Sequence, residues 1–151
     1  MAMYRSQAMT TYAATTTVQS SAHELTGAVT GTPRRWLQLE GVAALAAGAA
    51  LFVGTGAPWI LLVPLLFAVD ISMAGYLANP RVGAVTYNLA HNWGSGLVVL
   101  GIGLATGVVP LFAAGAILVA HTGMDRVAGY GLKYPTAFAD THLGRLGGGR
   151  R

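Results

Sequence analysis

Two long stretches of this chain contain no charged residue. Asp, Glu, Lys and Arg are absent from residues 41–69 and again from residues 82–120 of the 151 residues. A helix that crosses the hydrocarbon core of a bilayer needs about 20 mainly apolar residues, so these stretches can supply three to four such helices. Charged residues make up only 9% of the chain, against about a quarter in a soluble domain. The sequence therefore predicts an integral membrane protein.

Turns rich in Gly and Pro divide the apolar sequence into four segments. We expect an all-α bundle of four transmembrane helices. Residues 1–33 lack an apolar face and are predicted to be a disordered tail. Residues 34–128 would form the bundle, and residues 129–151 a cytoplasmic loop and tail, with a short helix near Asp140. The four predicted helices cover residues 36–53, 59–77, 84–105 and 111–128.

The basic residues predict the orientation of this bundle. In a four-span arrangement they all fall on one side, and Lys and Arg are concentrated on the cytoplasmic side of membrane proteins. We therefore expect both termini in the cytoplasm and a multi-pass location in the bacterial inner (plasma) membrane. Arg81 and Lys133 are expected to be headgroup anchors. The basic residues that flank the predicted helices are Arg34, Arg35, Arg81, Arg126, Lys133, Arg145, Arg150 and Arg151.

Charge and small residues also indicate which partners to expect. The net charge of +4 does not indicate nucleic acid, because the basic residues lie at the ends of apolar runs, where lipid headgroups would be. The lipid bilayer is therefore the expected partner.

Small residues such as Ala44, Ala47 and Gly48 allow helices to approach closely in lipid. They suit packing within the bundle, and they would also support a homo-oligomer.

Three ionisable residues share one predicted depth in the bilayer. Asp70, His91 and His121 each lie about seven residues, or about 10 Å, from the cytoplasmic end of their helix. Such groups are costly in lipid and are usually paired or functional. With Asp125, one turn after His121, they offer two imidazoles and two carboxylates. This set suits a divalent metal, zinc or non-haem iron.

Four residues are candidates for an acid or base beside this metal: Asp125, Glu40, Asp140 and His142. Glu40 is predicted about one turn closer to the cytoplasm than the three ligands, where it can instead pair with a neighbouring arginine. Asp140 and His142 would join the pocket if the loop after the fourth helix folds under the bundle. No HExxH motif is present, so the residues do not name a reaction.

Three functions remain open at this point. The first is a metal site that acts on a lipid or amphiphilic substrate near the cytoplasmic face. The second is a proton-linked transporter or channel, because Asp and His inside membranes commonly relay protons. The third is a subunit without catalytic activity that holds haem or a pigment, with His91 and His121 as axial ligands.

Several short motifs between residues 34 and 147 resemble a family of small bacterial membrane proteins designated a domain of unknown function, number 4260. The resemblance implies a small multi-span membrane protein and assigns no catalytic residue. The motifs that carry it are LEG at 39–41, DISMAGYL at 70–77, NPRVG at 79–83, Tyr87-Asn88 with His91, Ala120-His121 with Asp125-Arg126, GYGLKYP at 129–135 and DTHLG at 140–144.

Overall fold

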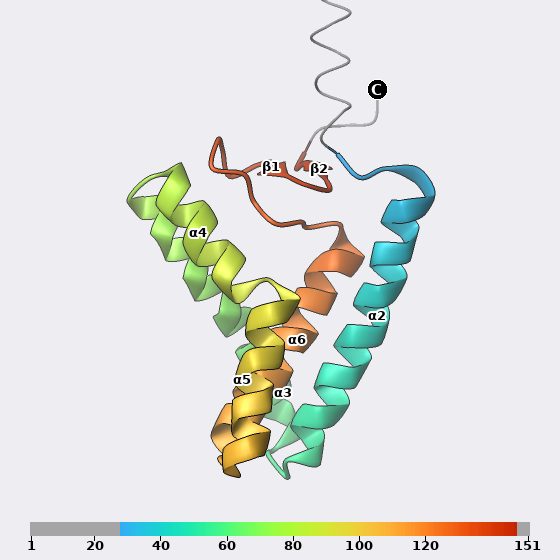
Figure 1. Cartoon of the computed structure of the whole chain (residues 1–151), viewed down its shortest axis with the longest axis vertical. Coiled ribbons are helices and arrows are strands. Elements are labelled where there is room, and N and C mark those ends of the chain that lie inside the picture. The colour runs from blue at the N-terminus through green and yellow to red at the C-terminus, as the bar shows by residue number, and fades with distance from the viewer. Residues whose placement is uncertain (1–27, 148–151) are drawn as a thin grey trace, which may run out of the picture.

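The computed structural model of the chain describes residues 28–147, and these residues are mostly helical (Figure 1). Five α-helices are present in this range, and α3 is extended at both ends by 3-10 helices, η1 and η2. A short antiparallel hairpin follows the last helix. The elements in chain order are α2 (Gly31–Gly54), η1 (Trp59–Leu61), α3 (Leu62–Ala68), η2 (Val69–Leu77), α4 (Pro80–Ala90), α5 (Trp93–Thr106), α6 (Val109–Ala128), β1 (Asp140–Thr141) and β2 (Gly144–Arg145).

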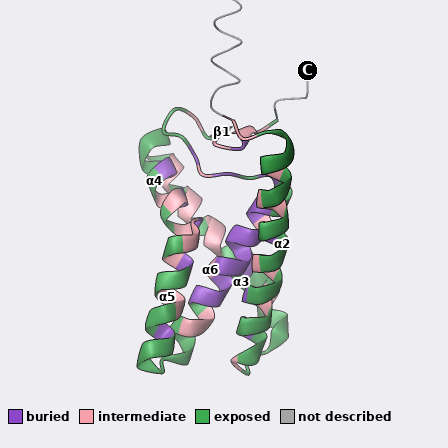
Figure 2. Cartoon of the chain, turned by 45° about the vertical axis from the view of Figure 1, so that its right-hand side comes forward, coloured by how far each residue is buried: buried purple, intermediate pink, exposed green. Residues whose placement is uncertain are grey.

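Helix α6 is the centre of the fold. It packs against α2 on one side and α5 on the other, while η2 and α4 pack together as a separate arm. Figure 2 shows the buried residues concentrated along α6, with the outer faces of α2 and α5 exposed. The η2–α4 arm and the α2–α6 pair diverge toward one end, where the β1–β2 hairpin lies across them (Figure 1).

Close packing of α2 on α6 depends on glycines. Gly41 and Gly48 are buried on α2, and Gly123 faces them from α6. A Cβ atom built on Gly48 would lie 2.6 Å from both the carbonyl oxygen of Ala116 and the backbone nitrogen of Ala120. The two backbones are therefore in direct contact, which is the packing that small residues permit between helices in lipid.

The outer faces of the helices are strongly apolar. Two segments, Gly31–Gly54 and Trp59–Leu77, are long and apolar enough to cross a membrane, and only 17% and 6% of their most apolar windows are buried within the chain. A core helix of a soluble protein would be mostly buried, so these segments do not have that role. Large side chains such as Trp59, Val63 and Leu104 are more than half exposed, and a soluble monomer rarely exposes so much contiguous apolar surface.

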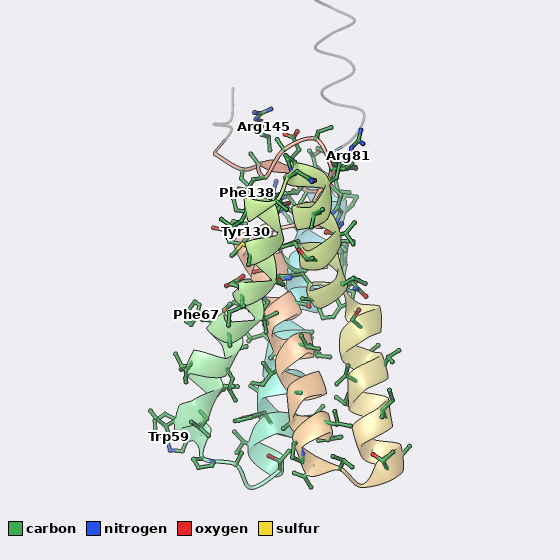
Figure 3. All side chains as sticks on the ribbon, turned by 90° about the vertical axis from the view of Figure 1, so that its left-hand side faces the viewer. Trp59, Phe67, Arg81, Tyr130, Phe138 and Arg145 are labelled. Carbon is green, nitrogen blue, oxygen red and sulfur yellow. The ribbon has the colours of Figure 1, made fainter. Side chains whose placement is uncertain are left out.

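The basic residues of residues 28–147 lie at or near one end of the molecule. Arg34 and Arg35 are in the first turns of α2, and Arg126 is in the last turn of α6. Figure 3 shows Arg81 and Arg145 at the hairpin end and Trp59 at the opposite end. The other end of the fold is formed by α3, α5 and the halves of α2 and α6 that contain no charged residue.

The third predicted helix is interrupted, which corrects the expectation of one helix over residues 84–105. α4 ends at Ala90 and α5 begins at Trp93. The Asn92 side chain competes with the helix, because its Oδ1 accepts a hydrogen bond from the Ser95 backbone N–H at 2.9 Å and its Nδ2 donates to the Asn88 carbonyl at 2.6 Å. Asn92 is therefore the N-cap of α5, the role for which Asn is strongly preferred.

The predicted short helix near Asp140 is also wrong, because this segment forms the β1–β2 hairpin. Asp140 pairs with Arg145 and Thr141 with Gly144. Gly144 has φ +109, a conformation that favours glycine, and the Thr141 hydroxyl donates to the Gly144 carbonyl at 2.6 Å. This local turn chemistry stabilises a hairpin instead of a helix.

The start of the first helix also differs from the prediction. α2 begins at Gly31, five residues before the predicted start at Trp36, with Pro33 in its first turn, where proline is tolerated. Most of the predicted tail, residues 1–27, lies outside the described residues. The last part of it is ordered, because the backbone N–H of Val29 donates to the His142 carbonyl at 2.9 Å.

Replacing Gly48 with Ala should destabilise the fold, because the new methyl group would force α2 and α6 apart. Overpacking of this kind costs about 1–3 kcal/mol, so the thermal unfolding temperature in detergent should fall clearly. Gly54→Ala is the matched control on the same helix, since a Cβ there meets nothing within 4 Å. Equal stability of the two variants would show that the α2–α6 contact is looser than described.

Candidate metal centre

Four side chains from three elements converge beneath the hairpin. Asp70 lies in η2, His91 directly follows α4, and His121 and Asp125 lie one turn apart on α6. His91 Nε2 is 3.3 Å from Asp70 Oδ1 and 3.9 Å from Asp125 Oδ2. His121 Nε2 is 3.6 Å from Asp70 Oδ1 and 3.7 Å from Asp125 Oδ1. Both imidazoles therefore direct the same nitrogen into the space between two carboxylates.

The tautomer of His91 follows from its second nitrogen. Nδ1 is 2.9 Å from the carbonyl oxygen of Tyr87, which only accepts hydrogen bonds, so Nδ1 carries a hydrogen. In neutral His91, Nε2 is then an unprotonated lone pair that faces carboxylate oxygens. A contact between acceptors is repulsive, so either a metal ion or a proton must lie between the ring nitrogen and the carboxylates. A carbonyl bonded to the far nitrogen is the usual support of a metal-binding histidine.

His121 is a second fully buried imidazole, and within residues 28–147 neither of its ring nitrogens has a hydrogen-bond partner. An unsatisfied buried polar group costs about 1–3 kcal/mol. The ring packs edge-on against His91, with centroids 4.6 Å apart. Nothing in its described surroundings explains a histidine here except the two carboxylates that it faces.

Asp125 is held in place by a buried hydroxyl. Tyr87 donates its O–H to Asp125 Oδ2 at 2.6 Å, and its ring stacks on His91 with centroids 3.7 Å apart. Tyr87 thus fixes one carboxylate and one imidazole of the cluster together. No signal in the sequence indicated that Tyr87 would reach α6.

The break between α4 and α5 is stabilised from α6. Arg126 is buried, and it donates to the His91 carbonyl at 3.3 Å and to the Tyr130 carbonyl at 2.8 Å. The first of these carbonyls is freed by the end of α4, so the guanidinium satisfies a group that would otherwise be unpaired. Arg126 therefore positions His91, and it donates these hydrogen bonds to carbonyls, which leaves the carboxylates to the histidines.

The spacing of the four ligands fits a metal ion. A tetrahedral site with metal–ligand bonds of about 2.0–2.2 Å has edges of about 3.3–3.6 Å. The distances from the two imidazoles to Asp70 Oδ1, 3.3 and 3.6 Å, match those edges. The distances to the two oxygens of Asp125, 3.9 Å to Oδ2 and 3.7 Å to Oδ1, are slightly longer. The ligand atoms of Asp70, His91 and His121 all lie within 4.8 Å of one another. These residues can therefore hold a divalent ion with little rearrangement.

The same geometry disfavours haem ligation by the two histidines. A macrocycle between them would need free space at both Nε2 atoms. That space is bordered by the carboxylates of Asp70 and Asp125, and the Tyr87 ring covers one face of His91.

Comparison with known proteins places the chain in a family without assigning an activity. Residues 34–146 match the family model described as "Domain of unknown function (DUF4260)". The chain belongs to this family. The matched range includes all four side chains of the cluster. Neither the curated proteins nor the solved structures gave a match.

A cavity of about 440 Å³ adjoins the cluster in this DUF4260 chain, and Asp70, Tyr87 and Asp125 line it. The loop after α6 forms its upper wall. Asn88 fixes this loop through the backbone of Lys133. The Lys133 N–H donates to Asn88 Oδ1 at 2.7 Å, and Asn88 Nδ2 donates to the Lys133 carbonyl at 2.9 Å. Figure 3 shows Phe67, Tyr130 and Phe138, three further lining residues, along one side of the molecule.

Lys133 was expected to be a headgroup anchor, but it is buried at this wall. Its Nζ donates to the Phe138 carbonyl at 2.8 Å and lies 4.0 Å from the centroid of the Phe138 ring. Burial lowers the pKa of the ammonium group, and the Asp125 carboxylate partly opposes that shift.

The other candidate acids and bases lie apart from the cluster. Glu40 is on the exposed face of α2. Asp140 accepts from Thr136 at 2.7 Å and pairs with Arg145 at 3.3 Å. His142 Nδ1 accepts from the Leu132 N–H at 2.8 Å, and burial together with the charge of Arg126 lowers its pKa. The loop covers the site, and in the described structure the hydrogen bonds of Asp140 and His142 lie within this cover.

Proposed function

We propose that this chain is a membrane-embedded metalloprotein whose divalent ion, zinc or non-haem iron, is bound by Asp70, His91, His121 and Asp125. The observation that carries the proposal is the pair of imidazole nitrogens directed at two carboxylates, at nitrogen–oxygen distances of 3.3–3.9 Å. Two imidazoles with carboxylate oxygens are a donor set that both metals accept. A bound ion would neutralise the carboxylates and give His121 Nε2 a partner.

The site has the features of a centre that acts on a ligand. A structural zinc is usually enclosed by its protein ligands, whereas a catalytic one keeps access to a substrate. Here the Asp70 side chain is 32% exposed, and both carboxylates border the adjacent cavity. Asp70, His91 and His121 alone would hold the ion when Asp125 gives up its coordination position to a ligand in the cavity, and the ion would then supply Lewis-acid chemistry toward a carbonyl or phosphoryl group. Asp125, which accepts the Tyr87 hydroxyl, would then be the carboxylate free to accept a proton.

We further propose that the chain crosses the bilayer four times, with both termini and the hairpin on the cytoplasmic side. The four spans would be α2, the segment Trp59–Leu77, the interrupted α4–α5 unit and α6. The exposed apolar faces and the position of the basic residues at the hairpin end support this arrangement. The metal site would then lie in the cytoplasmic half of the membrane.

A transporter or channel agrees less well with the described residues. A proton path needs polar groups along its length, and beyond the cluster the cavity between α2, α3 and α6 is lined entirely by apolar residues. The polar groups that remain inside the bundle lie on the hairpin side of that cavity.

Replacement of His121 by Leu tests the metal centre most cleanly. The purified wild type should carry about one zinc or iron per chain by elemental mass spectrometry, and His121→Leu should carry almost none. The metal should also raise the wild-type unfolding temperature by mass action. With chelator present, His121→Leu should be at least as stable as the wild type, because the imidazole that it removes has no described hydrogen-bond partner.

Glu40→Gln is the matched control, since it removes a carboxylate from an exposed site and should leave the metal content unchanged. The competing explanation is a proton on each Nε2, which would make the cluster a set of buried ion pairs. In that case the wild type would carry no more metal than His121→Leu, and the variant would be less stable even in chelator, because it would leave buried carboxylates unpaired.

Single cysteines test the orientation, because the chain has no cysteine of its own. Thr55→Cys and Thr106→Cys, in the turns at the end opposite the hairpin, should react with an impermeant thiol reagent applied from outside the cell. Val82→Cys, exposed at the start of α4, should react only after the membrane is opened. The reverse pattern would mean that the hairpin and the basic residues face outward.

A further inference from the structure

We infer that the cavity beside the metal centre binds an anionic amphiphile, with a carboxylate or phosphate headgroup between Lys133 and the metal and an apolar chain that leaves past Phe67. This inference rests on the proposed function, because the metal supplies part of the positive charge.

The charges around the cavity call for an anion. Asp70 and Asp125 carry two negative charges, and Arg126 and Lys133 carry two positive charges. A divalent ion between the carboxylates would therefore leave a net charge of about two positive units in a mostly buried region. Uncompensated charge is expensive in such surroundings, and an anionic headgroup is the ligand that would compensate it.

Lys133 is the cation that has hydrogen-bond donors left for the headgroup. An ammonium group has three donors, and the described structure gives Nζ one hydrogen bond, to the Phe138 carbonyl. Its other described neighbours are the faces of Phe138 and Tyr87, with the Tyr87 centroid 5.1 Å away. Residues 28–147 form no ion pair with Lys133. Arg126, in contrast, donates to the His91 and Tyr130 carbonyls.

The shape and lining of the cavity indicate the rest of the ligand. Its volume of about 440 Å³ is within the range of small-molecule sites. Away from Lys133 and the carboxylates the walls are apolar, with Phe67, Met73, Met124 and Leu146 among them. Phe67 is 60% exposed, on the apolar outer face of α3. A chain that leaves beside Phe67 would pass into the surrounding lipid, whereas a fully polar anion would leave these walls uncovered.

Native mass spectrometry can test this proposal because it counts metal and ligand on the same molecule. The full-length protein in a neutral detergent would be titrated with laurate and with dodecyl phosphate. Dodecanol, dodecyltrimethylammonium, acetate and inorganic phosphate separate the contributions of charge and chain. We expect saturable one-to-one binding of laurate or dodecyl phosphate to the metal-loaded chain, and binding at least tenfold weaker for the other four.

Lys133→Met should weaken binding of the anionic amphiphile at least tenfold and keep the metal, because Asn88 bonds only to the backbone of residue 133. Arg81→Met is the control, since it removes an exposed cation far from the cavity. Retained metal in Lys133→Met reports that the variant is folded. Should that variant lose its metal, Lys133→Arg, which keeps the charge, must retain both metal and amphiphile.

The outcomes separate the two proposals. A metal-loaded wild type that binds dodecanol as well as laurate, or a Lys133→Met variant that binds laurate normally, overturns the amphiphile site and leaves the metal centre intact. Binding of acetate or phosphate as tightly as laurate shows an anion site without a chain, which also overturns it. A wild type without metal overturns the metal centre, whatever it binds.

Discussion

An imidazole lone pair directed at a carboxylate is repulsive, and neutral His91 directs its Nε2 lone pair at both Asp70 and Asp125. The Tyr87 carbonyl fixes the hydrogen of His91 on the nitrogen that faces away from Asp70. His121, fully buried, lacks any described hydrogen-bond partner. A cation shared by the four side chains relieves all the repulsive contacts at once.

Much of the fold serves to bring these groups together. The glycines between α2 and α6 allow α6 to be buried along most of its length, so that His121 and Asp125 face inward. The interruption at Asn92 ends α4 where His91 can turn toward α6, and Arg126 satisfies the carbonyl that this interruption frees. Tyr87 then links the η2–α4 arm to α6 through Asp125. The hydrogen bonds of Tyr87 and Arg126 thus connect the η2–α4 arm to α6 where apolar packing does not.

The sequence predicted the cluster better than the elements that carry it. A common depth in three of the four apolar segments was enough to group Asp70, His91 and His121, because hydrophobic length fixes where a residue lies along a span. The predicted depth could not show that Glu40 faces outward, since the direction of a side chain around a helix depends on packing between helices. The interruption at residues 91–92 was missed because Asn88, His91, Asn92 and Ser95 also have the spacing of one helical face. Lys133 resembles a headgroup anchor in sequence, and only the return of the hairpin over the bundle buries it.

X-ray absorption spectroscopy at the metal edge tests the central claim most directly, because it identifies the atoms bound to the ion. For the purified, zinc-loaded protein we predict four ligands at about 2.0–2.2 Å, with the outer-shell scattering of two imidazoles. His91→Ala should remove part of the imidazole signal. A spectrum with oxygen ligands alone, or one that is identical in wild type and His91→Ala, would contradict the assignment of these histidines as metal ligands.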